Sequence, residues 1–199
     1  MTVSEHLVEF MRTPPPEAAR HEAKRLLLNQ LKASVGATDH PAIEIMHSWL
    51  LPPQPGGEAA HVLWLGTETT PDQAAFVNGA LFEVFDFHDT YIPTFLHAVS
   101  GVLPAAVAVA EAEGRTGAEL ADALALGIEV ELAIATILMP TGYYRGFVPA
   151  GLVGGTGAAA ACALLGGLDD ERARNALGLA MCTAGGVYES VGSMALVTA

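Results

Sequence analysis

Residues 116–140, which read TGAELADALALGIEVELAIATILMP, decide the fold class. Thr116 is followed three residues later by Glu119, and this spacing is typical of a capping box at the start of a helix. Pro140 ends the helix, because proline has no amide hydrogen to donate and its ring clashes with the preceding turn. The segment therefore predicts a long helix over residues 118–139.

Further helical segments, separated by proline and glycine, lie on both sides of this helix. Ser4 and the prolines at 14–16 bound a short helix, and Pro41 suits the first position of another. Thr70 followed by Pro71 starts a third helix. The predicted helices span residues 5–11, 17–35, 42–51, 73–87, 97–114 with a kink or restart at Pro104, 151–165 and 169–186, whereas the apolar run 61–66 is too short to assign.

The composition favours an all-α fold. Hydrophobic residues make up 51% of the 199 residues and aromatic residues only 7%. The apolar content is therefore mostly Ala, Val and Leu, which suit closely packed helices. A chain of this length can bury its core in one domain, and no repeat or low-complexity linker divides it. We expect a single helical domain over residues 1–199.

The chain is strongly acidic, with 22 acidic and 9 basic residues and a formal charge of −13. This charge would repel a phosphate backbone, so nucleic acid is not expected as a partner. It also works against anionic substrates unless local cations or backbone donors oppose it. Lys24, Arg25 and Lys32 in the segment 17–35 favour a solvated helix face over an anion site.

The N-terminal sequence and the cysteines favour a cytoplasmic protein. Residues 1–12 contain acids and a histidine, whereas a signal peptide needs a basic start and an apolar core. Cys162 and Cys182 lie in apolar runs without metal-type spacing, where a free thiol behaves as a small hydrophobe.

Residues 150–168 carry no charge and are long enough to raise the question of a membrane span. They are mostly Gly and Ala, which favour a soluble helix packed closely on its neighbours, whereas membrane helices are rich in Leu, Ile and Phe. The glycines of GLVGGTG (151–157) also resemble a dinucleotide fingerprint, but no strand is predicted before them. Close helix packing is the preferred interpretation, and no membrane partner is expected.

Polar residues gather in DFHDTYIPTFLH, residues 86–97, after an apolar helix. Carboxylates beside imidazoles shift each other's pKa towards neutrality and can act as general acids and bases. They can also bind metals, although Asp86, Asp89 and His97 on one loop match the usual ligand spacing only loosely. A third interpretation is that the group only caps a helix junction, because polar side chains at helix ends often satisfy backbone groups.

The stretch NGALFEVFDFHDTYIPTFLHAVSGVLPAAVAVAEAEG, residues 78–114, resembles the MmgE/PrpD family, in which an Asn-Gly helix leads to an Asp-Phe-Asp-Asp-Thr segment and a later His. Residues 118–135 and 142–186 resemble its next helices in the right order. The family includes 2-methylcitrate dehydratase and cis-aconitate decarboxylase, lyases that act on tricarboxylates without a metal or an organic cofactor. The resemblance implies a dimer formed through the helical domain, and a chain that lacks the family's C-terminal α+β domain.

The resemblance also implies roles for individual residues. The family's active-site Asp, Thr and His fall on Asp86, Thr90 and His97. Asp86 and His97 would act as acid and base, and Thr90 would donate a hydrogen bond to a substrate carboxylate. Further candidates for binding a small carboxylated substrate are His88, Asp89, Tyr144 and Arg145.

Apolar residues occupy three positions that are polar in the family's active site. Val148 stands in place of a second His, Ala150 in place of a Thr and Leu196 in place of a Lys. A trianionic substrate would therefore meet few cations here. We expect a lyase-type protein that works with a partner subunit supplying the C-terminal half, or that acts on another small carboxylate. The alternatives are a catalytically silent helical scaffold and a truncated copy that self-associates through exposed apolar faces.

Overall fold

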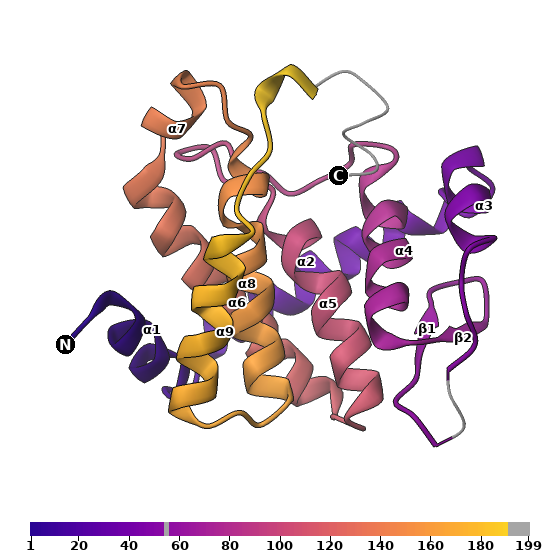
Figure 1. Cartoon of the computed structure of the whole chain (residues 1–199), viewed down its shortest axis with the longest axis horizontal. Coiled ribbons are helices and arrows are strands. Elements are labelled where there is room, and N and C mark those ends of the chain that lie inside the picture. The colour runs from indigo at the N-terminus through magenta and orange to yellow at the C-terminus, as the bar shows by residue number, and fades with distance from the viewer. Residues whose placement is uncertain (54–55, 191–199) are drawn as a thin grey trace.

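Most of the described chain, residues 1–53 and 56–190, is helical in the computed structural model (Figure 1). The α-helices are α1 (Val3–Met11), α2 (Glu17–Val35), α3 (Pro41–His47), α4 (Pro71–Glu83), α5 (Ala98–Ala112), α6 (Gly117–Leu138), α7 (Thr141–Tyr144), α8 (Pro149–Leu165) and α9 (Asp170–Cys182). Strands β1 (Ala60–Val62) and β2 (Thr67–Thr69) form an antiparallel hairpin, and a short 3-10 helix spans Tyr188–Ser190. The expected all-α class is confirmed, with one small hairpin added.

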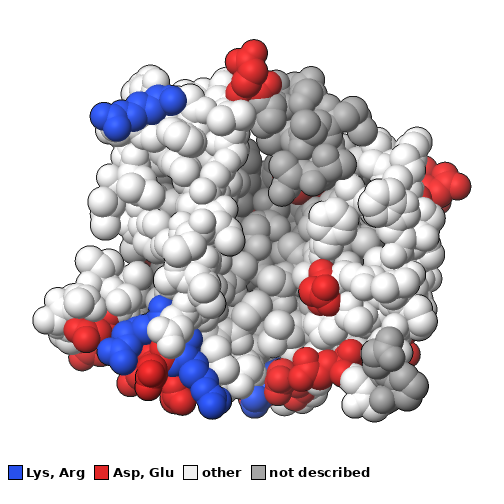
Figure 2. Space-filling view, in the orientation of Figure 1, with Lys and Arg blue, Asp and Glu red and all other residues white. Residues whose placement is uncertain are grey.

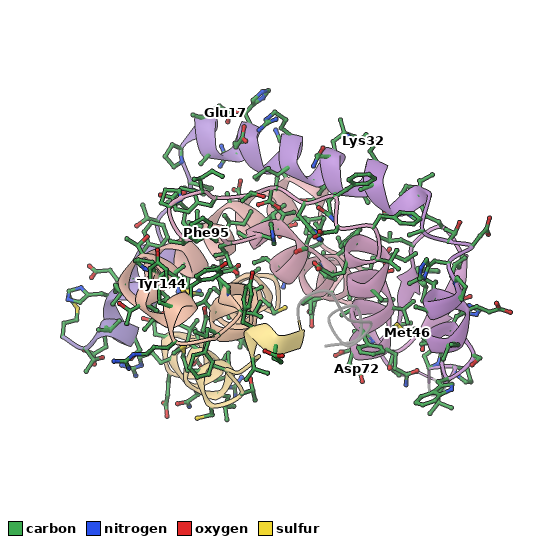
Figure 3. All side chains as sticks on the ribbon, turned by 90° about the horizontal axis from the view of Figure 1, so that it is seen from above. Glu17, Lys32, Met46, Asp72, Phe95 and Tyr144 are labelled. Atoms are coloured by element: carbon green, nitrogen blue, oxygen red, sulfur yellow. The ribbon has the colours of Figure 1, made fainter. Side chains whose placement is uncertain are left out.

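Helices α5, α6 and α8 form the centre of the molecule. Helix α8 packs against both α5 and α6, α9 packs on α8, and α4 lies against α5. Figure 1 shows α1 at one edge of this group and α3 with the hairpin at the other. Helix α2 runs along one side of the bundle, as Figure 3 shows from above, and contacts α4, α5 and α6. The largest core cluster joins Leu103, Leu124 and Val153 from the three central helices.

Helix α6 forms as the sequence predicts. The Thr116 hydroxyl accepts a hydrogen bond from the Glu119 amide at 3.3 Å, and a Glu119 carboxylate oxygen accepts one from the Thr116 amide at 2.8 Å. These reciprocal bonds satisfy backbone donors that would otherwise lack partners at the start of the helix. The helix ends at Leu138, two residues before Pro140.

The glycines of α8 allow neighbouring helices to approach closely. A Cβ added to Gly157 would lie 2.7 Å from Val102 Cγ2 in α5, and a Cβ on Gly127 in α6 would lie 2.8 Å from the Gly157 carbonyl oxygen. Because α8 follows helix α7 and a short loop rather than a strand, close packing is confirmed over a dinucleotide fingerprint. No helix within the described ranges is long and apolar enough to cross a membrane.

The basic residues of α2 lie on an exposed face. Lys24, Arg25 and Lys32 are all exposed, Arg25 pairs with Glu22, and Lys32 Nζ donates to Asn29 Oδ1 at 3.2 Å. This is the solvated helix face that the sequence predicts.

The ends of two predicted helices differ in the structure. Helix α1 is capped by Thr2, whose hydroxyl accepts from the Glu5 amide, and not by Ser4. Helix α3 ends at His47 and not at residue 51, because the Leu51 amide and carbonyl bond to Gln73 and Thr69 instead.

The structure resolves two points that the sequence left open. Helix α5 runs through Pro104 without restarting, and the alternative of a kink there stays a prediction. The unassigned run 61–66 belongs to the hairpin, whose backbone is held by Asn78 of α4: its Oδ1 accepts from the Leu63 amide at 2.8 Å and its Nδ2 donates to the His61 carbonyl at 3.1 Å.

Candidate active site

The predicted site lies on the loop between α4 and α5, at the upper end of the bundle in Figure 1. Helix α4 stops at Glu83 rather than at residue 87, and Asp86 takes a left-handed backbone conformation with φ 55°. Asn and Asp tolerate this conformation better than most residues with a side chain. The Asp86 side chain is 87% exposed, so it faces solvent at the start of the loop.

A tight turn brings Thr90 beside His97. The Tyr91 amide donates to the Leu96 carbonyl at 2.8 Å, and the Leu96 amide donates back to the Tyr91 carbonyl at 3.4 Å. Phe95 adopts φ 54° to complete the reversal. As a result, Thr90 Oγ1 lies 3.3 Å from His97 Nδ1, although seven residues separate them.

The backbone determines which nitrogen of His97 carries the proton. His97 Nδ1 lies 2.7 Å from the Asp89 carbonyl oxygen. A carbonyl oxygen can only accept, so the proton of the neutral ring is on Nδ1. The Nε2 atom then keeps its lone pair, which is the arrangement that a general base requires.

His88 connects Asp86 with His97. Its Nε2 lies 3.2 Å from Asp86 Oδ1 and 3.4 Å from Glu83 Oε2, and its side chain is only 2% exposed. The His88 and His97 rings are 4.8 Å apart, with an angle of 34° between their planes. The end of α4 and the loop therefore bring two imidazoles together with the carboxylates of Glu83 and Asp86, and a proton on His88 Nε2 can be shared with either of these carboxylates.

Asp89 points inward to the first turn of α5. Its Oδ1 accepts from the Val99 amide at 3.3 Å, so it caps a helix that has no side-chain cap of its own. Burial raises the pKa of the Asp89 carboxyl, while the Val99 amide and the charge of His97 oppose that rise. One interpretation of the sequence was that the whole polar cluster only caps a helix junction. Asp89 does cap a helix in this way, at the start of α5.

Helix α7 lies next to the site loop. The ring of Tyr143 is 5.3 Å from the ring of Phe95, and its hydroxyl donates to the Tyr188 hydroxyl at 3.1 Å. Tyr144, which is 79% exposed, lies on the same side of the molecule as Phe95 in Figure 3. Arg145 is exposed and forms no ion pair with a described residue. The sequence singled out Tyr144 but not Tyr143, which makes the contact with the loop.

The structure describes two of the three positions at which an apolar residue replaces a polar residue of the family. Val148 is half-buried at the N-cap of α8, where its amide donates to the Gly186 carbonyl at 3.1 Å, and Ala150 is half-buried in the first turn of the helix. Leu196 lies outside the described residues.

Few charged side chains lie on the upper half of the face shown in Figure 2, whereas acidic and basic residues gather along its lower edge. The site loop, residues 84–97, contains no Lys or Arg. Within residues 1–53 and 56–190, no group of three or more His, Cys, Asp or Glu side chains is arranged to hold a metal ion.

Glu131 of α6 was not predicted as a site residue, although it lies within the field of Asp89. It is fully buried, and neither of its carboxylate oxygens has a hydrogen-bond partner among the described residues. The sequence feature that could have indicated Glu131 is an acidic residue next to the apolar run LAIA. Glu129, two residues earlier, also lies among apolar residues but is exposed, so this feature does not distinguish the two.

Several relatives of this chain carry the name cis-aconitate decarboxylase or a name formed from it. Human cis-aconitate decarboxylase is 37% identical over 124 residues, which cover 58% of this chain and 25% of that protein. The mouse cis-aconitate decarboxylase is 35% identical over 120 residues, which cover 58% of this chain and 24% of that protein. The cis-aconitate decarboxylase-like protein oryM of Aspergillus oryzae is 26% identical over 189 residues, which cover 91% of this chain and 39% of that protein. The chain therefore spans less than half the length of these relatives.

A family match covers nearly the whole chain. Residues 2–196 match the family described as the MmgE/PrpD N-terminal domain. The match includes the site loop and all three central helices. The chain therefore belongs to the MmgE/PrpD family, through its N-terminal domain.

Proposed function

We propose that this chain contributes the acid–base residues of a lyase active site for a small carboxylated substrate. The observation that carries the proposal is the hydrogen bond from His97 Nδ1 to the Asp89 carbonyl, which leaves Nε2 free to accept a proton. A general base must have its lone pair available and its ring held in one orientation. Both conditions are met at His97.

The proposed reaction begins when His97 Nε2 removes a proton from carbon next to a substrate carboxylate. In a dehydration, the electron pair of that C–H bond forms the double bond, and the departing hydroxyl takes a proton from an acid. Asp86 and His88 are proposed to deliver that proton, since His88 Nε2 lies 3.2 Å from Asp86 Oδ1. A decarboxylation begins differently, without removal of a proton. The C–C bond to the leaving carboxylate breaks, CO2 departs, and the electron pair left on carbon takes a proton from the same groups.

Thr90, Tyr144 and Arg145 are proposed to bind the substrate. The Thr90 hydroxyl lies beside His97 and can donate to a carboxylate oxygen. Arg145 can pair with a carboxylate because no described acid occupies it. The names of the relatives favour a decarboxylase acting on an unsaturated tricarboxylate.

The substrate's remaining charges call for cations from outside the described residues. Val148 and Ala150 offer none, and the described site loop contains no Lys or Arg. We assign the additional cations to a second copy of the chain or to a further polypeptide, in keeping with the share of the relatives that this chain spans.

The test compares His97→Asn with His21→Asn. An Asn at position 97 can still donate to the Asp89 carbonyl but has no basic nitrogen, whereas His21 is exposed on α2, away from the site loop. Ultraviolet absorbance of cis-aconitate, citrate or 2-methylcitrate reports loss or gain of the conjugated double bond. We expect turnover in the complete assembly to fall by roughly 100-fold or more with His97→Asn and to remain unchanged with His21→Asn. Equal turnover in both variants would refute the assignment.

A second candidate function is a scaffold without catalysis. Val148 and Ala150 favour it, because they place apolar side chains at the start of α8. This function predicts a folded helical protein that assembles with its partner and turns over none of the three substrates.

A further inference from the structure

Glu131 lies at the junction of three helices. It belongs to α6 and is 0% exposed. Its side chain extends over the glycines of the neighbouring helices: a Cβ added to Gly157 would lie 2.7 Å from Glu131 Oε2, and one added to Gly154 would lie 3.7 Å from Oε1. Gly101 of α5 is the third neighbour, where an added Cβ would lie 3.9 Å from Oε1. Because glycine has no side chain, these three positions leave the space that the Glu131 carboxyl group occupies.

The surroundings of Glu131 disfavour a negative charge. Neither oxygen has a hydrogen-bond partner within the described ranges. An ionised carboxylate buried without a partner is costly, so such a group keeps its proton instead. Burial and, to a smaller extent, the charge of Asp89 raise the pKa of Glu131 well above its ordinary value.

Asp89 is the charged neighbour that acts on Glu131 from outside α6. Helix α8 carries no charged residue, and the single one in α5, Glu111, lies at the far end of that helix and accepts from the His61 amide at 2.7 Å. Where α2 meets α6, Arg20 is paired with Asp122. Among the described residues, Asp89 is therefore the charged group outside α6 that acts on Glu131, in addition to the larger effect of burial.

The two carboxyl groups are not equivalent. The Asp89 carboxylate accepts a hydrogen bond from the Val99 amide and lies within the field of His97. The hydrogen bond and the imidazole charge both favour the ionised form of Asp89. Glu131 has neither. When two carboxyl groups interact, the group with fewer stabilising partners keeps the proton. The pKa of Asp89 is raised, but that of Glu131 is raised further.

We propose that Glu131 is a positioning residue of the candidate site, which holds a proton at neutral pH and thereby keeps the negative charge on Asp89, at the start of α5 and beside His97. That charge stabilises the imidazolium that forms when His97 takes a proton. The role rests on the proposed function, because it assigns His97 as the base. The protonation of Glu131 itself is independent of any substrate.

The experiment measures the free energy of unfolding against pH for the full chain, Glu131→Gln and the matched control Glu129→Gln. A carboxyl whose folded pKa exceeds its unfolded pKa contributes stability that is complete below the unfolded value and is lost as pH rises towards the folded value. We expect the folding constant of the unmodified chain to fall about tenfold per pH unit relative to Glu131→Gln within that window. Glu129→Gln, at an exposed site, should follow the unmodified chain. Parallel curves for the chain and Glu131→Gln would overturn the proposal.

A second readout addresses the positioning role through the two carboxyl groups themselves. Carbon-13 nuclear magnetic resonance of the side-chain carboxyls in the unmodified chain should show Asp89 ionised and Glu131 protonated at neutral pH. An ionised Glu131, or a proton on Asp89 instead, would also overturn the proposal. If Glu131→Gln does not fold, carbon-13 labelling of the glutamate carboxyls in the unmodified chain gives the same answer, because one carboxyl must remain protonated at neutral pH. These measurements use no substrate, so a failed lyase assay leaves their outcome intact.

Discussion

Replacing Gly157 by alanine tests the close helix packing that surrounds Glu131. A Cβ at residue 157 would lie 2.7 Å from Glu131 Oε2, 2.7 Å from Val102 Cγ2 and 2.9 Å from Glu131 Cβ. Overpacking a core typically costs about 1–3 kcal/mol, whereas removing a helical glycine gains roughly 0.5–1 kcal/mol. We therefore expect Gly157→Ala to lower the free energy of unfolding by about 0.5–2 kcal/mol.

Gly178 provides a matched control, because it is also helical but a Cβ there would meet no atom within 4 Å. Gly178→Ala should raise the free energy of unfolding by roughly 0.5–1 kcal/mol. Urea unfolding followed by far-ultraviolet circular dichroism gives both values. A stability gain in both variants would show that α8 is not packed closely at Gly157, and would refute the account of the junction around Glu131.

Three further predictions concern other parts of the chain. Thr116→Ala removes the cap of α6 and should lower the free energy of unfolding by about 1 kcal/mol in the same urea assay, and an unchanged midpoint would contradict the capping role. Asp122→Asn breaks the partly exposed ion pair with Arg20 and should cost only about 0.2–1 kcal/mol, less at high salt, so a large and salt-independent loss would argue against this account. Burial raises the pKa of Cys162 to about 11, whereas Cys182 is exposed; a thiol reagent at neutral pH should label Cys182 first, and rapid labelling that persists in Cys182→Ser would show that Cys162 is accessible.

Local signals predicted those helices whose ends are set by their own residues. The boundaries of α2 match the prediction at 17–35, because the prolines before it and the glycine after it act locally. Helix α6 follows its capping box for the same reason. The shift of the first cap from Ser4 to Thr2 shows the limit of this method, since both residue types cap helices and only the backbone conformation selects one.

Elements set by distant contacts were predicted poorly. The end of α3 depends on bonds from Leu51 to Gln73 and Thr69, and the hairpin depends on Asn78 of α4. The run 61–66 contains no pattern long enough to indicate a strand. Such elements form because another part of the fold supplies the partners for their backbone groups.

The candidate site shows the same division. The sequence indicated Asp86, Thr90 and His97 by their residue types and by resemblance, and their catalytic and binding roles stay predictions. Only the folded loop shows that Thr90 contacts His97 and that the Asp89 carbonyl fixes the His97 tautomer. Glu131 escaped prediction because burial, not residue type, distinguishes it from Glu129.

The sequence by itself determined the helical class, the positions of the main helices and the family, because these follow from local capping, apolar content and motif order. The tertiary structure decided which side chains contact one another and which of their titratable atoms carry a proton. Helix α8 can approach α5 and α6 because its glycines leave room, and that approach buries Glu131 without a hydrogen-bond partner in the part of the chain that the structure describes. Protonation depends on solvent exposure and neighbouring groups, and both are properties of the packed molecule alone.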